Sequence, residues 1–174
     1  NPARFDMKKL EAINGDKIRA LPVEEVIKRA LPFMESAGIA LMGEQAQALF
    51  ARAIPLIHER IVTLAEIPDY VRFLFTEKFA IDSEAKEKAL TADSLPILAA
   101  AEGAISAITE WKLDAIESAL RSALIEGLAL KPKNAFTPVR VAVTGARVSP
   151  PLFESIELLG KERTLERLKA AQAG

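Results

Sequence analysis

The chain has 174 residues, of which 50% are hydrophobic and 27% charged, and its formal net charge is −1 at pH 7. This composition excludes a fibrous or disordered protein and allows a folded core. The sequence contains no cysteine, which excludes disulfides and thiolate metal sites. The single histidine, His58, cannot form a zinc site alone. A reducing cytoplasm is the simplest setting, and we expect neither a metal nor a cofactor in this chain.

The N-terminus and the most apolar stretch of the sequence bear on targeting and membrane insertion. The N-terminus begins with neither Met nor the charged-then-apolar run of a signal peptide, so we expect a piece of a longer protein. The most apolar stretch, residues 95–101, is far shorter than the ~20 residues that a membrane span needs. We therefore expect no membrane role.

Charge is distributed unevenly along the chain. Residues 131–174 contain eight Lys/Arg and four Glu, whereas the preceding residues contain 15 basic and 20 acidic side chains. The segment 131–150 includes four cations and no acid. Such a local excess attracts a phosphate backbone, although a solvated loop can show the same pattern.

Apolar spacing predicts helices almost everywhere, and therefore an all-α fold. We expect a short helix over 5–14 that ends at Asn14-Gly15, and another over 22–38 with Pro22 in its first turn. The longest helical pattern covers 44–66, where Pro55 must bend or split the helix. A short segment follows over 70–75.

The second half is predicted to contain five more helices. Asp82 or Ser83 caps a short charged helix, and Asp93-Ser94 precedes an Ala-rich one over 95–108. The clearest amphipathic pattern covers 113–128. Residues 129–138 are expected to form a loop, and residues 139–143 show the only alternation of apolar and polar residues typical of a strand. The last two predicted helices cover 152–159 and 162–171. A domain boundary near 79–82 would give an N-terminal helical subdomain, 1–80, and a C-terminal one, 81–174.

No catalytic signature is present in the sequence. It lacks a glycine-rich phosphate loop, a Gly-x-Ser-x-Gly elbow and an HExxH motif. We expect His58 to form a surface or interhelical hydrogen bond rather than to act in catalysis. Trp111 lies between two predicted helices, where a core position is more common than base stacking, and both remain open.

The most informative stretch is the basic tail. Lys131, Lys133 and Arg147 accompany a Pro-x-Arg-x-Ala-x-Thr-Gly sequence over 138–145, which is followed by Ser149-Pro150-Pro151-Leu152-Phe153 and Leu158-Leu159-Gly160-Lys161-Glu162. Physically this is a proline-rich segment with an arginine in an apolar frame, a turn, and the start of a helix. Such a surface suits single-stranded RNA.

This order of residues closely resembles the end of bacterial glutamyl-tRNA synthetases, which are class I aminoacyl-tRNA synthetases. Residues 1–14 are similar to the family's segment just after its Lys-Met-Ser-Lys-Ser loop, so the resemblance spans the chain. It implies an α-helical cage of two anticodon-binding subdomains, with the end of a stem-contact region at 1–20. It also implies a monomeric cytoplasmic protein that binds the anticodon arm of tRNA(Glu). The catalytic domain, which attaches glutamate to tRNA(Glu) using ATP and magnesium, is missing, so the chain should be inactive alone.

The resemblance also implies roles for single residues. The positions that touch anticodon bases in the family correspond to Arg140, Ser149, Pro150 and Leu152, and the turn at Thr144-Gly145 shapes that surface. Lys131, Lys133 and Arg147 are expected to contact the phosphate backbone. For the third anticodon base the best candidate is Arg60, with Arg52 as an alternative.

Two other classes of function remain as alternatives. A helical protein-interaction module could dock a partner through a groove formed by Ile116, Leu120 and Leu124. A stand-alone enzyme is disfavoured because no nucleophile–base pair or metal set is found. Discrimination between glutamate and glutamine tRNA is left open.

Overall fold

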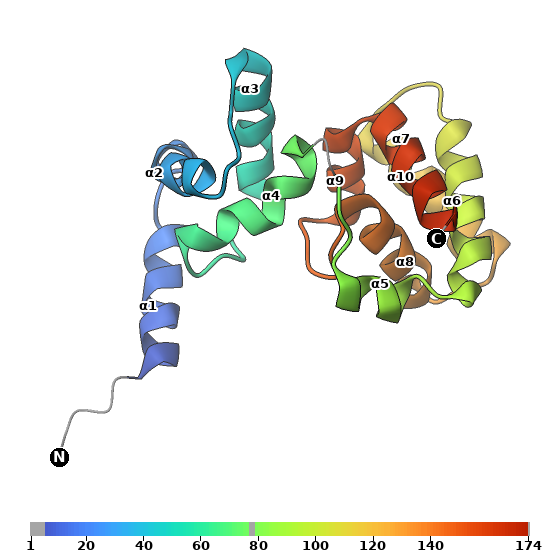
Figure 1. Ribbon diagram of the computed structural model, residues 1–174, viewed down its shortest axis with the longest axis horizontal. Helices are drawn as coiled ribbons and strands as arrows, with labels where there is room; N and C mark the ends of the chain where they lie inside the picture. The colour runs from blue at the N-terminus through green and yellow to red at the C-terminus, as the bar shows by residue number, and fades with distance from the viewer. Residues whose placement is uncertain (1–5, 77–78, 174) are drawn as a thin grey trace. The chain divides into compact units, whose positions relative to one another are not determined.

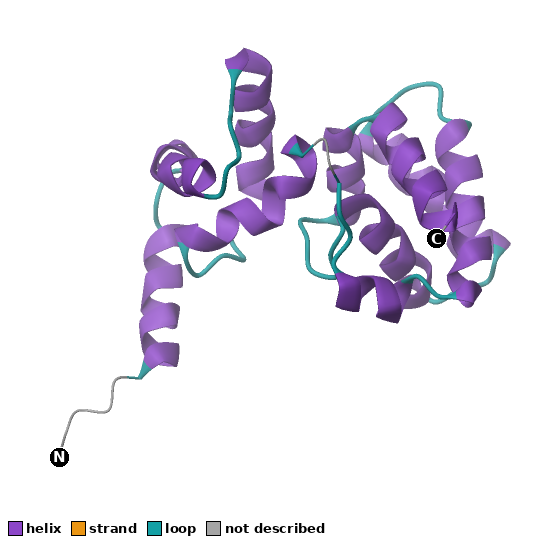
Figure 2. Ribbon diagram, viewed as in Figure 1, coloured by secondary structure: helices purple, strands orange, loops and turns teal. Residues whose placement is uncertain are grey.

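The computed structural model describes residues 6–76 and 79–173, which fold into ten α-helices, three 3₁₀ turns and one π-helical turn without a strand (Figures 1 and 2). The predicted all-α fold is confirmed. The chain divides into two compact units, Asn1–Thr76 and Glu77–Gly174, and each has its own core.

Over its described residues, 6–76, the N-terminal unit contains four α-helices and two 3₁₀ turns: α1 (Met7–Arg19), α2 (Val23–Ser36), α3 (Gly43–Ala53), η1 (Ile54–Leu56), η2 (Leu64–Glu66) and α4 (Ile67–Phe75). The face of α2 that carries Val26, Ala30 and Met34 is fully buried, and α2 packs on α4, η1 and η2. Pro22, expected in the first turn, is the N-cap residue just before α2, and Gly38 follows the helix with φ 72°, as predicted. Helix α2 continues through Pro32.

Helix α1 differs from the prediction at its C-terminal end. We expected Asn14-Gly15 to stop it, but α1 continues to Arg19, and the predicted start at Phe5 lies outside the described residues. Gly15 is buried, and a Cβ at this position would lie 3.3 Å from Val62 Cγ1. The glycine therefore allows a close approach to the segment at Val62, whose carbonyl accepts a hydrogen bond from the Asn14 amide. A sequence pattern alone does not distinguish this use of glycine from a helix stop.

Pro55 splits the long pattern over 44–66. Helix α3 ends at Ala53 and the 3₁₀ turn η1 follows, because Pro55 cannot donate a backbone hydrogen bond. His58 lies in the next turn, is 8% exposed, and its Nε2 is 2.8 Å from the carbonyl oxygen of Ile18. The predicted hydrogen bond between helical segments is confirmed. His58 thus ties the turn after η1 to α1.

Where the structure describes it, over residues 79–173, the C-terminal unit contains six α-helices, one 3₁₀ turn and one π-helical turn: α5 (Ser83–Ala89), η3 (Ala92–Ser94), α6 (Leu95–Ser106), α7 (Leu113–Arg121), η4 (Ser122–Gly127), α8 (Pro132–Thr144), α9 (Leu152–Leu159) and α10 (Lys161–Ala173). Helix α8 packs against α5, α6, α9 and α10 and lies at the centre of the unit (Figure 1). As predicted, Asp82 caps α5, accepting a hydrogen bond from the backbone N–H of Ala85 at 2.8 Å.

The expectation for residues 129–143 was wrong. Residues 132–144 form one helix instead of a loop followed by a strand. Pro132 occupies the first helical turn, where its missing N–H costs nothing, and Pro138 lies inside. Ala135, Val139 and Ala142 have no exposed surface, and their spacing places all three on one buried face of the helix. Tertiary packing of this face therefore overrides the local effect of Lys, Pro and Asn.

The amphipathic pattern over 113–128 forms α7 and then the π-helical turn η4. Ile116, Leu120 and Leu124 are fully buried, whereas Leu128 is 39% exposed. The alternative that the first three line a docking groove is therefore wrong, because their side chains already form the core of the C-terminal unit.

Candidate nucleic-acid interface

Arg140 connects α8 to the segment before α9. Its Nη1 donates hydrogen bonds to Ser149 Oγ and, at 2.8 Å, to the carbonyl oxygen of Pro150. The Ser149 hydroxyl lies 2.8 Å from the same carbonyl. Three residues that the sequence separates by up to ten positions are thus brought together. A guanidinium supplies the donors for such a contact in one rigid plane.

The predicted base-contacting residues differ in exposure. Arg140 is half-buried, whereas Ser149 and Leu152 are each 4% exposed and Pro150 is also buried. Leu152 is the first residue of α9 and packs into the core of the unit. In this conformation Arg140 is therefore the most accessible member of the group.

The predicted turn at Thr144-Gly145 closes α8. Gly145 has φ 78°, and its N–H donates to the carbonyl oxygen of Val141 at 2.9 Å. Its own carbonyl accepts a hydrogen bond of 2.9 Å from the Asp82 N–H. A Cβ at position 145 would lie 2.8 Å from the Ala80 carbonyl oxygen. Only glycine fits both this dihedral angle and this close approach.

Arg167 supports the same turn from α10. Its side chain is buried, its Nη1 donates to the Val143 carbonyl oxygen at 2.5 Å, and its guanidinium lies 3.8 Å from the centre of the Phe79 ring. Burial lowers the pKa of Arg167 to about 10, with a further lowering by the charge of Arg163. Arg167 is therefore still a cation at neutral pH. Its contacts assign it a structural role.

The predicted phosphate-contacting residues lie around the two ends of α8. Lys131 is the N-cap of α8, Lys133 lies in its first turn, and Arg147 follows its C-terminal end. All three are exposed, and the first turn of α8 contains no acid. Helix N-termini carry partial positive charge, so the lysines add to a favourable electrostatic potential.

Helices α7, α8 and α9 together form an aromatic cluster that no sequence pattern indicated. Phe136 and Phe153 meet edge to face with ring centres 5.3 Å apart, and the Arg121 guanidinium lies 5.8 Å and 5.5 Å from the two rings. Phe136 precedes Arg140 by one helical turn. Only the tertiary structure brings Arg121 to these rings, although the Leu-Phe pair at the start of α9 was visible as a motif.

Trp111 has a structural contact in the same unit. It is half-buried, and its Nε1 donates a hydrogen bond of 3.1 Å to the Glu157 carbonyl oxygen on α9. The Glu157 carboxylate accepts a second bond, of 3.0 Å, from the Leu113 N–H. These contacts join the start of α7 to α9, which favours the structural role for Trp111.

In the N-terminal unit the candidates are two exposed arginines. Arg60 ends the turn that contains His58, and Arg52 lies in the last turn of α3. Each of them is engaged in an interaction within the chain. Both remain candidates for reading the third base.

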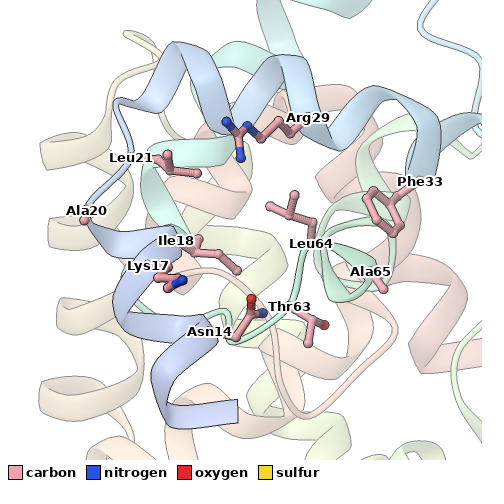
Figure 3. A pocket seen from close by; sticks show the side chains of 10 residues that line it. All are labelled: Asn14, Lys17, Ile18, Ala20, Leu21, Arg29, Phe33, Thr63, Leu64 and Ala65. Atoms are coloured by element: carbon pink, nitrogen blue, oxygen red, sulfur yellow. The ribbon is translucent and has the colours of Figure 1, made fainter. Parts of the chain in front are cut away.

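The N-terminal unit also contains a cavity of about 570 Å³ between α1, α2 and the segment around η2 (Figure 3). Leu21, Phe33 and Leu64 give it mainly apolar walls. Arg29 reaches the cavity but is paired with Glu25 at 2.6 Å, and this contact lowers the pKa of Glu25. Lys17 also lines the cavity and is exposed, so a cation accompanies its apolar walls.

Two other kinds of feature are absent from the described part of the chain. Within residues 6–76 and 79–173, no three His, Asp or Glu side chains cluster in a way that could hold a metal ion. None of the helices described is long and apolar enough to cross a membrane.

Comparison with known proteins identifies a protein family that this chain matches. A family model described as an anticodon binding domain matches residues 25–172. Helix α1 lies before the matched region.

Among curated proteins, the chain is 47% identical over 173 residues to a glutamate–tRNA ligase from Saccharopolyspora erythraea, with 98% of this chain and 34% of that protein covered. It is 50% identical over 173 residues to a glutamate–tRNA ligase from Mycobacteroides abscessus, covering 99% of this chain and 34% of that protein. The chain thus spans about a third of the length of these relatives. A crystal structure of a glutamate tRNA ligase from Elizabethkingia meningosepticum superposes with a TM-score of 0.77 at 22% identity, over 98% of this chain and 33% of that one. This likeness shows the fold.

Proposed function

The chain belongs to the family of anticodon binding domains, and we propose that it recognises the anticodon of a tRNA as the helical part of a glutamate–tRNA ligase. The observation that carries the proposal is the match over residues 25–172, supported by 47–50% identity to two such ligases. The exposed cations around α8 fit this role, because a phosphate backbone dominates the affinity of RNA binding.

The proposal covers the whole ligase as well as this chain. The remainder of the protein attaches glutamate to tRNA(Glu) with ATP and magnesium, and this chain alone binds the anticodon arm and catalyses nothing. The protein works as a monomer in the cytoplasm, and its two units, Asn1–Thr76 and Glu77–Gly174, form two anticodon-binding subdomains. Arg140 and the segment 149–152 read bases in the second subdomain, and Arg60 or Arg52 reads the third base in the first.

The geometry around Arg140 suggests how one side chain can serve two purposes. Its Nη1 holds Ser149 and the Pro150 carbonyl, which fixes the segment before α9. The flat face of a half-buried guanidinium can also stack on an unstacked base. Bases would then meet a surface that is formed before binding, which reduces the entropy cost of association.

The test is a titration of the chain with an anticodon stem–loop RNA from glutamate tRNA and with a control whose anticodon is replaced. We expect tighter binding of the native anticodon, and an affinity that falls steeply with salt. Arg140→Ala should abolish the anticodon preference, whereas Lys169→Ala, which removes an exposed cation on α10, should keep it. Thermal unfolding of each variant separates lost recognition from lost structure.

Equal binding of both RNAs by the wild-type chain would contradict the proposal. So would an Arg140→Ala variant that is folded and keeps the preference, because Arg140 would then serve only to hold the segment before α9.

A further inference from the structure

A second cavity, here called the α5–α8 cavity, lies within the C-terminal unit. The end of α5, the turn η3 and the start of α6 form one side, and the first half of α8 and Arg147 form the other. Its volume is about 420 Å³, within the range of about 300–1,000 Å³ that is typical of small-ligand sites. Four apolar residues contribute to its walls: Ala89, Ile97, Leu130 and Pro138.

The charge of this cavity is positive. Among its described lining residues, Lys88, Lys133 and Arg147 are cations and Asp93 is the only carboxylate. Lys88 is paired with Glu84, but neither Lys133 nor Arg147 has an ion-pair partner among the described residues. Two uncompensated cations at the edge of one cavity favour an anionic ligand.

Hydrogen-bonding groups lie next to the apolar walls. Asn134 and Thr91 are exposed and line the cavity, and within the part of the chain that the structure describes their side chains form no hydrogen bond. The Thr137 hydroxyl donates to the Lys133 carbonyl oxygen at 2.7 Å and keeps its lone pairs. None of the described lining residues is aromatic. A planar ligand would thus be recognised by its edge and not by stacking.

We propose that the α5–α8 cavity receives one unstacked ribonucleotide of single-stranded RNA. Its phosphate lies between Lys133 and Arg147, its base lies against the apolar wall, and Asn134 hydrogen-bonds the edge of the base. The cavity is distinct from the group formed by Arg140 and the segment 149–152, none of which lines it. This inference rests on the proposed function and adds a further recognition site to it.

The first test fills the cavity without changing its charge. Thr137→Trp places an indole into it from a half-buried helical position, and Ser118→Trp makes the same kind of exchange at an exposed position on α7 outside it. The probe is the anticodon stem–loop RNA of glutamate tRNA with a fluorescent label, measured by anisotropy at fixed salt. We expect Thr137→Trp to weaken binding by about tenfold, the size of one lost hydrogen bond, because the indole excludes the nucleotide from the cavity, and Ser118→Trp to leave binding unchanged.

The second test removes single groups. Asn134→Ala should abolish the preference for one base at a single position of the loop, found by replacing the loop bases one at a time. Lys133→Ala should reduce the slope of log K against log salt by about one, whereas Lys86→Ala, which removes an exposed cation of α5 outside the cavity, should not.

The outcomes separate the two proposals. If the native anticodon is preferred but Thr137→Trp binds like the wild-type chain, the cavity is not a nucleotide site and the proposed function stands. If Thr137→Trp weakens binding but Asn134→Ala leaves every base preference intact, Asn134 does not read the base edge and that inference is overturned. If the wild-type chain does not distinguish anticodons, the proposed function itself fails.

Discussion

Gly145 permits a sharp test of the physical reasoning, because alanine would meet two separate penalties there. A residue with a Cβ at φ 78° costs about 1–2 kcal/mol. The new Cβ would also lie 2.8 Å from the Ala80 carbonyl oxygen, where ordinary contacts begin at 3.4 Å, so backbone must move. Overpacking of this kind costs about 1–3 kcal/mol. We therefore expect Gly145→Ala to lower the free energy of unfolding of the C-terminal unit by about 2–5 kcal/mol.

The same exchange at Gly103 should act in the opposite direction. Gly103 is exposed inside α6, and a Cβ there would have no neighbour within 4 Å. Gly103→Ala should stabilise the unit by about 0.5–1 kcal/mol, because alanine loses less backbone entropy in a helix. Urea unfolding followed by the fluorescence of Trp111, which lies in this unit, measures both variants. A loss below about 1 kcal/mol for Gly145→Ala, or an equal loss for Gly103→Ala, would refute the argument.

Two further predictions concern polar contacts within the same unit. Arg167→Met should lower the free energy of unfolding by about 2 kcal/mol, because it leaves the Val143 carbonyl without its charged donor and removes the contact with Phe79. Urea unfolding measures this loss. The control Lys169→Met, at an exposed site, should change the free energy of unfolding by less than about 0.5 kcal/mol. Trp111→Phe should lower the free energy of unfolding by about 1 kcal/mol, because the hydrogen bond to Glu157 is lost. The measurement is the shift in the midpoint of thermal unfolding, and an unchanged midpoint would exclude that contribution.

Much of the fold could be predicted because it depends on local chemistry. Helical spacing of apolar residues indicated an all-α protein, and the helix starts after Pro22, Asp82 and Pro151 follow from backbone restrictions and capping. Pro55 was expected to bend or split its helix, and it splits it. These features depend on one residue and its immediate neighbours, so no tertiary information was needed.

The errors arose where packing competed with local preference. Residues 132–144 looked like a loop because of their Lys, Pro and Asn, but the helical spacing of Ala135, Val139 and Ala142 was present in the sequence and decided the outcome. Gly15 looked like a helix stop, and its actual use depends on Val62, which is distant in sequence.

The candidate site likewise combines features that the sequence determines with features that only the tertiary structure decides. The sequence determined which residues are available: a cysteine-free helical chain with a basic tail, and a motif that contains Arg140, Gly145 and the segment 149–152. The tertiary structure decided which of them lie together and which are accessible. It placed the Arg140 guanidinium on Ser149 and Pro150, buried Leu152, and formed the α5–α8 cavity from segments more than 30 residues apart. The reason is physical: residue type fixes the chemistry that a side chain can offer, whereas distance and exposure depend on contacts that only the folded chain makes.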